Sequence, residues 1–277
     1  MDQVTVVVAT RDRRTELERS LARHEAPVIV VDNGSVDGSP AAVRTGFPGA
    51  EVIALGHNLG APARNIGVAQ ASTPYVAFAD DDSWWAPGAL EAAARHLDAH
   101  PRLALIAGHI LVGEDEVPDP ICAAMRHAPL GTEADLPGPS VLGFLACGAI
   151  VRRSAFLAVG GFDDVVFFYG EEERVALDLA AAGWGLAYVE DVVAHHHPTS
   201  IAGDRGGRRA LATRNSVLTA CLRRPWRVVG RRAVRAALDD AATRAGLRAT
   251  VPRLAPALAQ RRRLPPRVEA AARSLRA

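Results

Sequence analysis

Short apolar runs alternate with amphipathic stretches over the first two hundred residues. Four runs predict buried strands, because they are brief and rich in valine, isoleucine and alanine: residues 4–9, 26–31, 51–55 and 75–79. The stretch after the first run places Leu17 and Leu21 on one helical face, and residues 61–71 predict another helix. Strands that alternate with helices indicate an α/β fold with a mostly parallel central sheet flanked by helices.

Polar side chains follow each of these runs: Asp12, Asp32 with Asn33, Asn58, and the triplet Asp80-Asp81-Asp82. Taken singly, each group is ordinary turn chemistry, as in Asp32-Asn33-Gly34. Taken together, they fall where the strands of a parallel sheet end, and ligands of such sheets bind beyond the carboxyl ends of the strands. The pattern therefore predicts a binding site at this edge of the sheet.

The acidic triplet concentrates negative charge at the end of the fourth run. Neighbouring carboxylates repel one another and raise one another's pKa unless a cation or hydrogen-bond donors compensate. Mg²⁺ and Mn²⁺ prefer such oxygen ligands and keep positions open for phosphates. The alternative is an acidic turn that caps the next helix, with Asp82 or Ser83 as the N-cap and Pro87 in the first turn.

Composition places the chain among globular proteins that bury one core and carry an appendage, with 277 residues of which 49% are hydrophobic. No apolar stretch reaches the length of a membrane span, and no signal peptide precedes the first strand, so we expect a cytoplasmic protein. Cys122, Cys147 and Cys221 are odd in number and lack metal-ligand spacing, which favours reduced thiols.

Charge divides the chain in two. Residues 1–200 hold 13 arginines against 27 acidic residues, whereas residues 201–277 hold 19 arginines against 4 acidic residues, and every basic residue is arginine. Near-helical spacing of Leu211, Val217 and Leu218 predicts helices in the second part. One interpretation is that these helices are solvated and pack on residues 1–200. The alternatives are that they contact an anionic membrane or an acidic partner. No nucleic-acid motif is present, so no nucleic acid is expected as a partner.

The motifs, in their order along the chain, resemble family 2 glycosyltransferases of the GT-A fold over about the first 200 residues. These are Val-Ala-Thr-Arg-Asp at 8–12, Asp-Asn-Gly-Ser at 32–35, Asn-Leu-Gly at 58–60 with Arg64-Asn65, and Phe-Ala-Asp-Asp-Asp at 78–82. The resemblance implies a Rossmann-like GT-A domain over residues 1–200, with a nucleotide-sugar half (about 1–112) and an acceptor half (about 113–200). Residues 201–277 then form an Arg-rich helical extension.

The resemblance also implies roles for individual residues. A nucleoside-diphosphate sugar is bound by Thr10, Asp12, Asp32, Asn33, Asn58, Arg64, Asp80 and Asp81. Asp80 and Asp82 are the outer residues of a D-x-D motif, with Asp82 as a ligand of Mn²⁺ or Mg²⁺ and Asp80 facing the ribose and the metal. Asp12 departs from the family pattern, which often has Asn there. Trp84, Trp85 and Glu171 are assigned to the acceptor side.

Three glutamates follow Gly170 at the start of a predicted helix, where the helix dipole favours acidic residues. The family has Gly-Gly-Phe-Asp, as at 160–163 here, followed by a Glu-Asp pair whose second carboxylate deprotonates the acceptor hydroxyl. Glu172 matches that position and is the implied general base. Asp178 stands where the family often has Arg.

Three histidines, 195–197, follow the last predicted strand. They form a surface run or include a metal ligand, since imidazole binds ions of the Mn²⁺ class. The family places a ligand histidine here, and spacing to Thr199 favours His196, whereas spacing to Ser200 favours His197. Residues 113–140 are long, Pro-rich and acidic, which indicates a substrate-facing loop or disorder.

The sequence thus predicts an inverting, metal-dependent glycosyltransferase with a glycan, lipid or natural-product acceptor, at the inner face of the membrane if the extension binds there. One alternative is a nucleotidyltransferase, which releases pyrophosphate and usually has a Gly-rich loop after the first strand. Residues 10–14, which follow the first strand here, contain no glycine, and this argues against a nucleotidyltransferase. Another alternative is a nucleotide-sugar-binding scaffold without activity.

Overall fold

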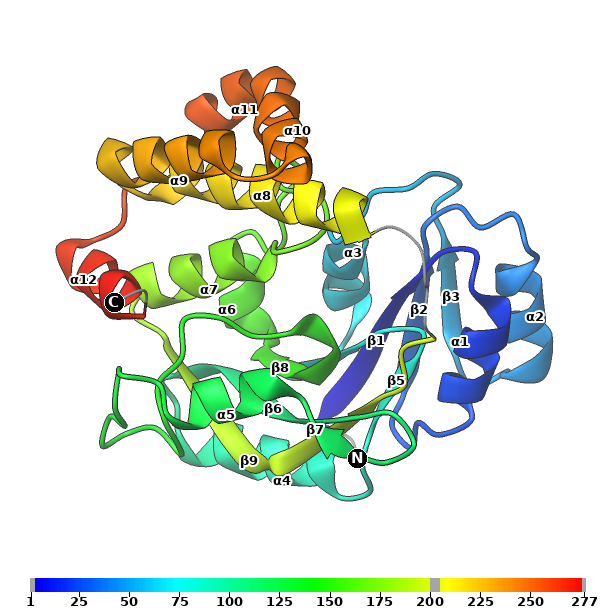
Figure 1. Ribbon diagram of the computed structural model, residues 1–277. Coiled ribbons are helices and arrows are strands. Elements are labelled where there is room, and N and C mark those ends of the chain that lie inside the picture. The colour runs from blue at the N-terminus through cyan, green and yellow to red at the C-terminus, as the bar shows by residue number, and fades with distance from the viewer. Residues whose placement is uncertain (1–2, 200–204, 276–277) are drawn as a thin grey trace.

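A computed structural model describes residues 3–199 and 205–275 of the chain (Figure 1). The strands are β1 Val4–Thr10, β2 Val28–Asp32, β3 Glu51–Ala54, β4 Tyr75–Ala79, β5 Ser83–Trp85, β6 Leu103–Val112, β7 Val117–Pro118, β8 Ala149–Arg152 and β9 Gly185–His196. The helices of the first two hundred residues are α1 Arg14–Leu21, α2 Ser39–Gly46, α3 Ala63–Gln70, α4 Ala89–Ala99, α5 Pro120–Arg126, α6 Arg153–Ala158 and α7 Glu172–Ala181, with a 3-10 turn at Ala146–Gly148.

One mixed sheet contains all of these strands, in the order β3-β2-β1-β4-β8-β6-β9-β5, with β7 paired to β6. Its first four strands are parallel, and Thr10 lies opposite Asp32, so their polar ends reach the same edge. Strand β8 then runs antiparallel to both β4 and β6. The predicted α/β class with a helix-flanked central sheet is confirmed, and the antiparallel pairs belong to β5, β7 and β8.

Both faces of the sheet are buried, which is why β1 and β4 read as continuous apolar runs. On one face Val7, Val31 and Phe78 pack against α3, α5, α6 and α7. On the other face Val6 and Val30 pack against α1, α2 and α4. The helices therefore form a layer on each side of the sheet, as Figure 1 shows.

The acidic triplet does not cap a helix. Strand β5 follows it directly, and α4 begins at Ala89 after Gly88, whose φ of +77° is a conformation that glycine adopts at low cost. The interpretation of Asp82 or Ser83 as an N-cap is therefore wrong. The segment 113–140 contains β7 and α5, and the Asp119 carboxylate caps α5 by accepting from Ile121 N at 2.9 Å.

The extension comprises α8 Arg205–Arg223, α9 Trp226–Leu238, α10 Ala241–Thr250, a 3-10 turn at Val251–Arg253, α11 Leu254–Ala259 and α12 Pro266–Ser274. In Figure 1, α8 to α11 lie together above α6 and α7, and α12 lies beside α7. Val165 and Val166 of the first part share a buried cluster with Val217 and Leu218 of α8. The extension is thus packed onto the sheet domain through a common core.

Cys122, Cys147 and Cys221 are all buried and form no disulfide in the part of the chain described. None of the helices within residues 3–199 and 205–275 combines the length and the apolar character that crossing a membrane requires.

Candidate active site

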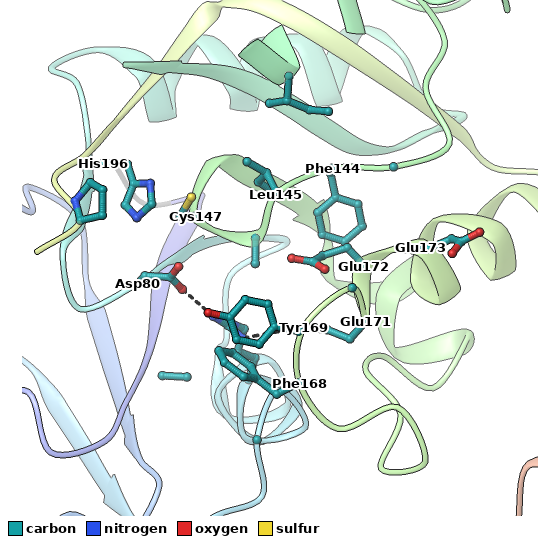
Figure 2. Close-up of a pocket in the computed structure, with 18 of the residues that line it drawn as sticks. Asp80, Phe144, Leu145, Cys147, Phe168, Tyr169, Glu171, Glu172, Glu173 and His196 are labelled. Carbon is teal, nitrogen blue, oxygen red and sulfur yellow. Dashed lines mark hydrogen bonds and ion pairs between the residues drawn. The ribbon is translucent and has the colours of Figure 1, made fainter. Parts of the chain in front are cut away.

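A cavity of about 960 Å³ opens beyond the ends of β1 and β4 (Figure 2). Its polar side includes Thr10, Arg13, Asn33, Asn58, Arg64, Asp80, Asp81, Asp82, His196 and Thr199. Its apolar side includes Ile121, Met125, Phe144, Leu145, Phe168 and Tyr169. Glu172 also lines the cavity. The sheet therefore brings most of the predicted residues together, as the rule for carboxyl ends of parallel strands requires.

Arg13 neutralises part of the acidic triplet. Its Nε lies 2.6 Å from Asp81 Oδ1, and its Nη2 lies 2.7 Å from Asp82 Oδ2. Thr10 Oγ1 also donates to Asp81 Oδ2 at 3.1 Å. Burial raises the pKa of Asp81 to about 7, against the opposing effect of Arg13. Asp81 is thereby fixed within the protein, and Asp80 and Asp82 are the outer residues of the triplet.

Arg64 binds the first carboxylate of the triplet from α3. Its Nη2 lies 2.5 Å from Asp80 Oδ1, and its Nη1 lies 3.9 Å from Glu171 Oε1. The Arg64 side chain is almost completely buried, so this charge needs those partners. Arg64 therefore connects the acidic triplet to the acidic turn before α7.

The side chains suited to a divalent metal lie between β4 and β9. His196 Nε2 is 3.3 Å from Asp82 Oδ1, and ligand atoms of Asp80, Cys147 and His196 all lie within 4.8 Å of one another. Two atoms that each bind one ion at about 2.1 Å are separated by about 3–4 Å, so the Asp82–His196 spacing fits. Burial opposes protonation of His196, but the hydrogen bond and charge of Asp82 raise its pKa.

The other two histidines face elsewhere. His195 Nδ1 lies 3.2 Å from Glu116 Oε1, and its ring stacks on Trp84 at 5.3 Å. The His197 ring lies 4.6 Å from the same Trp84 ring. Of the three histidines, only His196 lines the cavity. The alternative that pairs His197 with Ser200 falls partly outside the described residues.

Of the predicted base-binding residues, Asn33 and Asn58 line the cavity, whereas Asp32 does not. Asp32 is 2% exposed, and its Oδ2 accepts from Gly34 N and Ser35 N, while Oδ1 is buried without a partner. Asn33 and Asn58 line the cavity, and each accepts a backbone hydrogen bond in the 58–60 turn. A buried carboxylate oxygen without a donor is an acceptor that a ligand N–H can satisfy.

Asp12 does not line the cavity. It adopts a left-handed conformation with φ of +53°, and its Oδ1 accepts from Val36 N at 2.7 Å. The side chain organises the 33–38 turn, a contact that the strand pattern could not show.

The three glutamates have different environments. All three line the cavity, and Figure 2 shows Glu172 below the Phe144 ring. Glu173 Oε1 lies 2.7 Å from Arg232 Nη2. Glu171 is 3% exposed and has one buried oxygen without a partner. Burial raises the pKa of Glu171 and of Glu172, and the charge of Glu172 adds to the effect on Glu171.

Trp84 and Trp85 do not reach the acceptor side of the cavity. Trp85 is 4% exposed, packs in the core, and donates from Nε1 to Phe78 O at 3.2 Å. The Arg23 guanidinium lies over the Trp84 ring, with its Cζ 4.0 Å from the ring centroid. Their place after the triplet suggested the cavity, but the alternation of side chains along β5 directs them elsewhere.

Sequence reasoning missed Arg13, Cys147 and the apolar side of the cavity. Arg13 directly follows the first strand, so its position was a usable signal. The run 167–170, Phe-Phe-Tyr-Gly, immediately precedes the predicted base and was another. The placement of Met125 and Phe144 depends on contacts between distant segments, which no local pattern shows.

A parallel nucleotide-type half-sheet, an acidic triplet at its edge and a second, mixed half that closes the cavity together define a glycosyltransferase of the GT-A fold. The chain belongs to glycosyl transferase family 2, whose family model matches residues 5–160.

Two relatives and one solved structure show the range of similarity. An N-acetylglucosaminyl-diphospho-decaprenol L-rhamnosyltransferase of Mycobacterium tuberculosis is 30% identical over 241 residues, covering 73% of this chain and 78% of the relative. A pre-mycofactocin glycosyltransferase of the same organism is 36% identical over 210 residues, or 72% of this chain and 43% of that protein. The mannosyltransferase PcManGT of Pyrobaculum calidifontis, solved with GDP-Man and Mn²⁺, has a TM-score of 0.60 at 22% identity, covering 93% of this chain and 74% of that chain.

Proposed function

We propose that this glycosyltransferase moves a sugar from a nucleoside-diphosphate sugar to an acceptor hydroxyl, with inversion and with Glu172 as the general base. The observation that carries the proposal is the position of Glu172, whose carboxylate enters the same cavity as the acidic triplet. All three carboxylates of the 171–173 turn line the cavity, but Glu171 is buried beside Arg64 and Glu173 pairs with Arg232.

The polar side of the cavity suits the nucleotide. Asp32 does not line the cavity, but it precedes the lining residue Asn33 and has an unpartnered buried oxygen that could accept from an N–H of the base. The turn that Asn33 and Asn58 bind lies beside it. Arg13 and Arg64 bring two cations to the region where the diphosphate leaves. Thr10, Asp80 and Asp81 complete this side, and Asp12 supports it from behind.

Asp82 and His196 are the residues that would hold Mn²⁺ or Mg²⁺, with Asp80 facing the same ion. A divalent ion there supplies Lewis-acid stabilisation of the negative charge that grows on the diphosphate. The mannosyltransferase of similar fold was solved with Mn²⁺, which supports a divalent metal here.

Glu172 takes the proton of the acceptor hydroxyl as the new oxygen–carbon bond forms at the anomeric carbon. The bond from that carbon to the diphosphate oxygen breaks, and the nucleoside diphosphate leaves with the electron pair. A single displacement of this kind inverts the anomeric centre. The raised pKa of Glu172 makes it a stronger base than an ordinary glutamate, which is the tuning a general base needs near neutral pH.

The apolar side favours an acceptor that carries an apolar group. Ile121 and Met125 of α5 face this space together with Phe144 and the exposed ring of Phe168. A free glycan has little apolar surface to bury against such a wall, whereas a lipid carrier or an apolar natural product does. The decaprenol named in one relative supports a lipid-linked acceptor.

Helix α9 presents a face suited to an anionic membrane, as the charge balance of the extension suggests. Arg227, Arg231 and Arg235 are exposed at intervals of four residues, and Trp226 and Leu238 are 58% and 82% exposed beside them. Exposed arginines next to apolar side chains are typical of helices that lie in the membrane interface. Binding to phosphatidylglycerol vesicles at low salt, absent in an R227Q/R231Q/R235Q variant and on neutral vesicles, is the expected result.

A thermal-shift screen tests the donor. UDP-, GDP- and dTDP-sugars are added with and without Mn²⁺, and the cognate donor raises the melting temperature by mass action, more with the ion than without it. The same mixtures are then analysed for products. Release of nucleoside diphosphate supports the proposal, release of pyrophosphate indicates a nucleotidyltransferase, and binding without turnover indicates a scaffold.

A further inference from the structure

The segment 163–171 connects the Phe162 region to α7 and carries the aromatic part of the cavity wall. Phe167 and Tyr169 both have φ of +72°, a left-handed conformation that residues with a side chain rarely adopt. The Phe168 and Tyr169 rings meet edge to face at 4.8 Å beside the cavity. A backbone of this kind persists only where its surroundings hold it.

Asn215 of α8 makes the main hydrogen bonds that fix the segment 163–171. It is fully buried, and its Nδ2 donates to the carbonyl of Tyr169 at 2.6 Å and to the carbonyl of Phe168. Arg214 Nε donates to Asn215 Oδ1 at 2.9 Å, so both ends of the amide are engaged and its orientation is fixed. Arg214 Nη2 also donates to Val166 O at 3.1 Å.

Hydrogen bonds from Arg253 and from Ala61 also fix the segment 163–171. Arg253 Nη1 donates to Asp164 O at 2.8 Å and to Val165 O at 2.9 Å. From the nucleotide half, Ala61 N donates to Phe167 O at 2.8 Å, and a Cβ at Gly60 would lie 2.7 Å from that oxygen. The segment is therefore fixed between the nucleotide half and the extension.

The helix that follows is fixed by the same extension. Arg223 of α8 makes a two-pronged pair with Asp178 of α7, with Nη2 to Oδ2 at 2.9 Å. Arg232 of α9 binds Glu173, the neighbour of Glu172. Several arginines of the extension thus point inward, at carbonyls and carboxylates around the acceptor half of the cavity.

We propose that Asn215 is a positioning residue for transfer, an inference that rests on the proposed function. It does not line the cavity, so it acts through the segment that it holds. By fixing two adjacent carbonyls, it sets where the Phe168 and Tyr169 rings stand and where Glu172, three residues after Tyr169, enters the cavity. The extension then contributes to transfer by positioning the aromatic segment and Glu172.

Asn215→Leu tests this, because leucine has nearly the same size but donates no hydrogen bond. Hydrogen exchange of the amides in 163–171 should accelerate at least tenfold. Release of nucleoside diphosphate from the sugar nucleotide that the wild type hydrolyses should fall about tenfold to a hundredfold. Affinity for the nucleoside diphosphate with Mn²⁺, measured by calorimetry, should stay within about twofold, since a geometric displacement affects the reaction far more than donor binding.

Thr219→Val is the matched control. Thr219 lies one turn further along α8, is equally buried, and its hydroxyl has no hydrogen-bond partner in the part of the chain described. Thr219→Val should leave unchanged the hydrogen exchange of 163–171, the release of nucleoside diphosphate and the affinity for it. If Asn215→Leu does not fold, Arg214→Met removes the bond that orients the amide and should show the same pattern more weakly.

An Asn215→Leu protein that melts earlier but keeps wild-type exchange in 163–171 and wild-type release below its melting temperature overturns the proposal. Equal losses of donor affinity and release also overturn it, because they place the effect on the donor side. If the wild type releases no nucleoside diphosphate from any sugar nucleotide, the proposed function fails, while the exchange comparison still decides whether Asn215 holds the segment.

Discussion

The polar and apolar sides of the cavity are built by different means. On the polar side, Thr10, Asn33 and the acidic triplet lie at the ends of strands, and Arg13 and Arg64 neutralise the triplet from neighbouring elements. On the apolar side, the aromatic segment is irregular and is held from α8 by Asn215, more than forty residues away. The polar side of the cavity is therefore supported by the sheet, and the apolar side by the C-terminal helices.

Substitution of Glu172, the proposed base, should have the largest effect on transfer. Glu172→Gln keeps the size of the side chain but cannot take a proton, and general-base catalysis contributes a factor of about 10²–10⁴. Nucleoside-diphosphate release should fall within that range, with donor affinity near that of the wild type. Steady-state rates and calorimetry check both quantities.

Glu173→Gln is the control for that substitution, since Glu173 lines the same cavity but its carboxylate pairs with Arg232. Its rate should stay within a few-fold of the wild type. Full activity in Glu172→Gln beside an inactive Glu171→Gln would move the base by one residue.

Contacts within the extension should contribute measurably to the free energy of unfolding. Arg224, directly after α8, and Glu269 of α12 form a buried pair, with side chains 1% and 8% exposed and Nε to Oε2 at 2.6 Å. Removing one partner of such a pair costs about 3–5 kcal/mol because the other charge stays buried. Glu269→Gln should lower the free energy of unfolding in urea by about that amount.

Asp239→Asn provides the comparison for the buried pair. Asp239 pairs with Arg209 at 2.8 Å, but both side chains are about half exposed. Its loss should cost about 1 kcal/mol or less. Equal effects of the two substitutions would mean that α12 adds little to the support of α7.

On the polar side, Asp82→Ala should remove the Mn²⁺-dependent part of nucleoside-diphosphate affinity, because the ion loses a ligand. We expect a loss of at least about tenfold in the presence of Mn²⁺ and little change without it. His196→Gln should weaken the same dependence less. His195→Gln, whose ring stacks on Trp84 instead, should leave it unchanged.

His24 offers a smaller effect in the nucleotide half, away from the cavity. Both of its ring nitrogens are buried without partners, and burial lowers its pKa to about 4 from the ordinary 6.5. The unfolded chain therefore takes up the proton first on acidification, so stability should fall between about pH 6.5 and 4 and be unaffected above that range.

His24→Leu should remove this dependence. Between pH 7 and 4.5, the wild type should lose about 2 kcal/mol more than the variant. Urea unfolding of both proteins at the two pH values gives the difference directly. Parallel losses would show that other groups control acid stability.

The same contrast explains what the sequence could predict. Apolar runs and the polar residues after them identified β1, β2, β4 and the acidic triplet, because period and turn chemistry are local. Glu172 and His196 were found by resemblance to a family, and the structure brings both to the cavity. Asp12, Trp84 and Trp85 were placed wrongly at the cavity because the backbone conformation and the pairing of β5 decide where they point.

The apolar side lay beyond local reasoning. The left-handed conformation of Tyr169, a bulky residue without glycine's freedom, is set by Asn215, and no pattern near either residue indicates the other. The arginine-rich composition of the extension predicted a cationic surface. Arg214, Arg223 and Arg253 instead bind within the protein, which only the packed structure shows.

The most direct test of the account is to follow the products by NMR. The donor found in the thermal-shift screen is incubated with Mn²⁺ and a lipid-linked acceptor, using the wild type and Glu172→Gln. The account predicts release of nucleoside diphosphate and a new glycosidic bond of inverted anomeric configuration, with Glu172→Gln still binding the donor but forming little of either product. A product of retained configuration, or pyrophosphate in place of the nucleoside diphosphate, would contradict it.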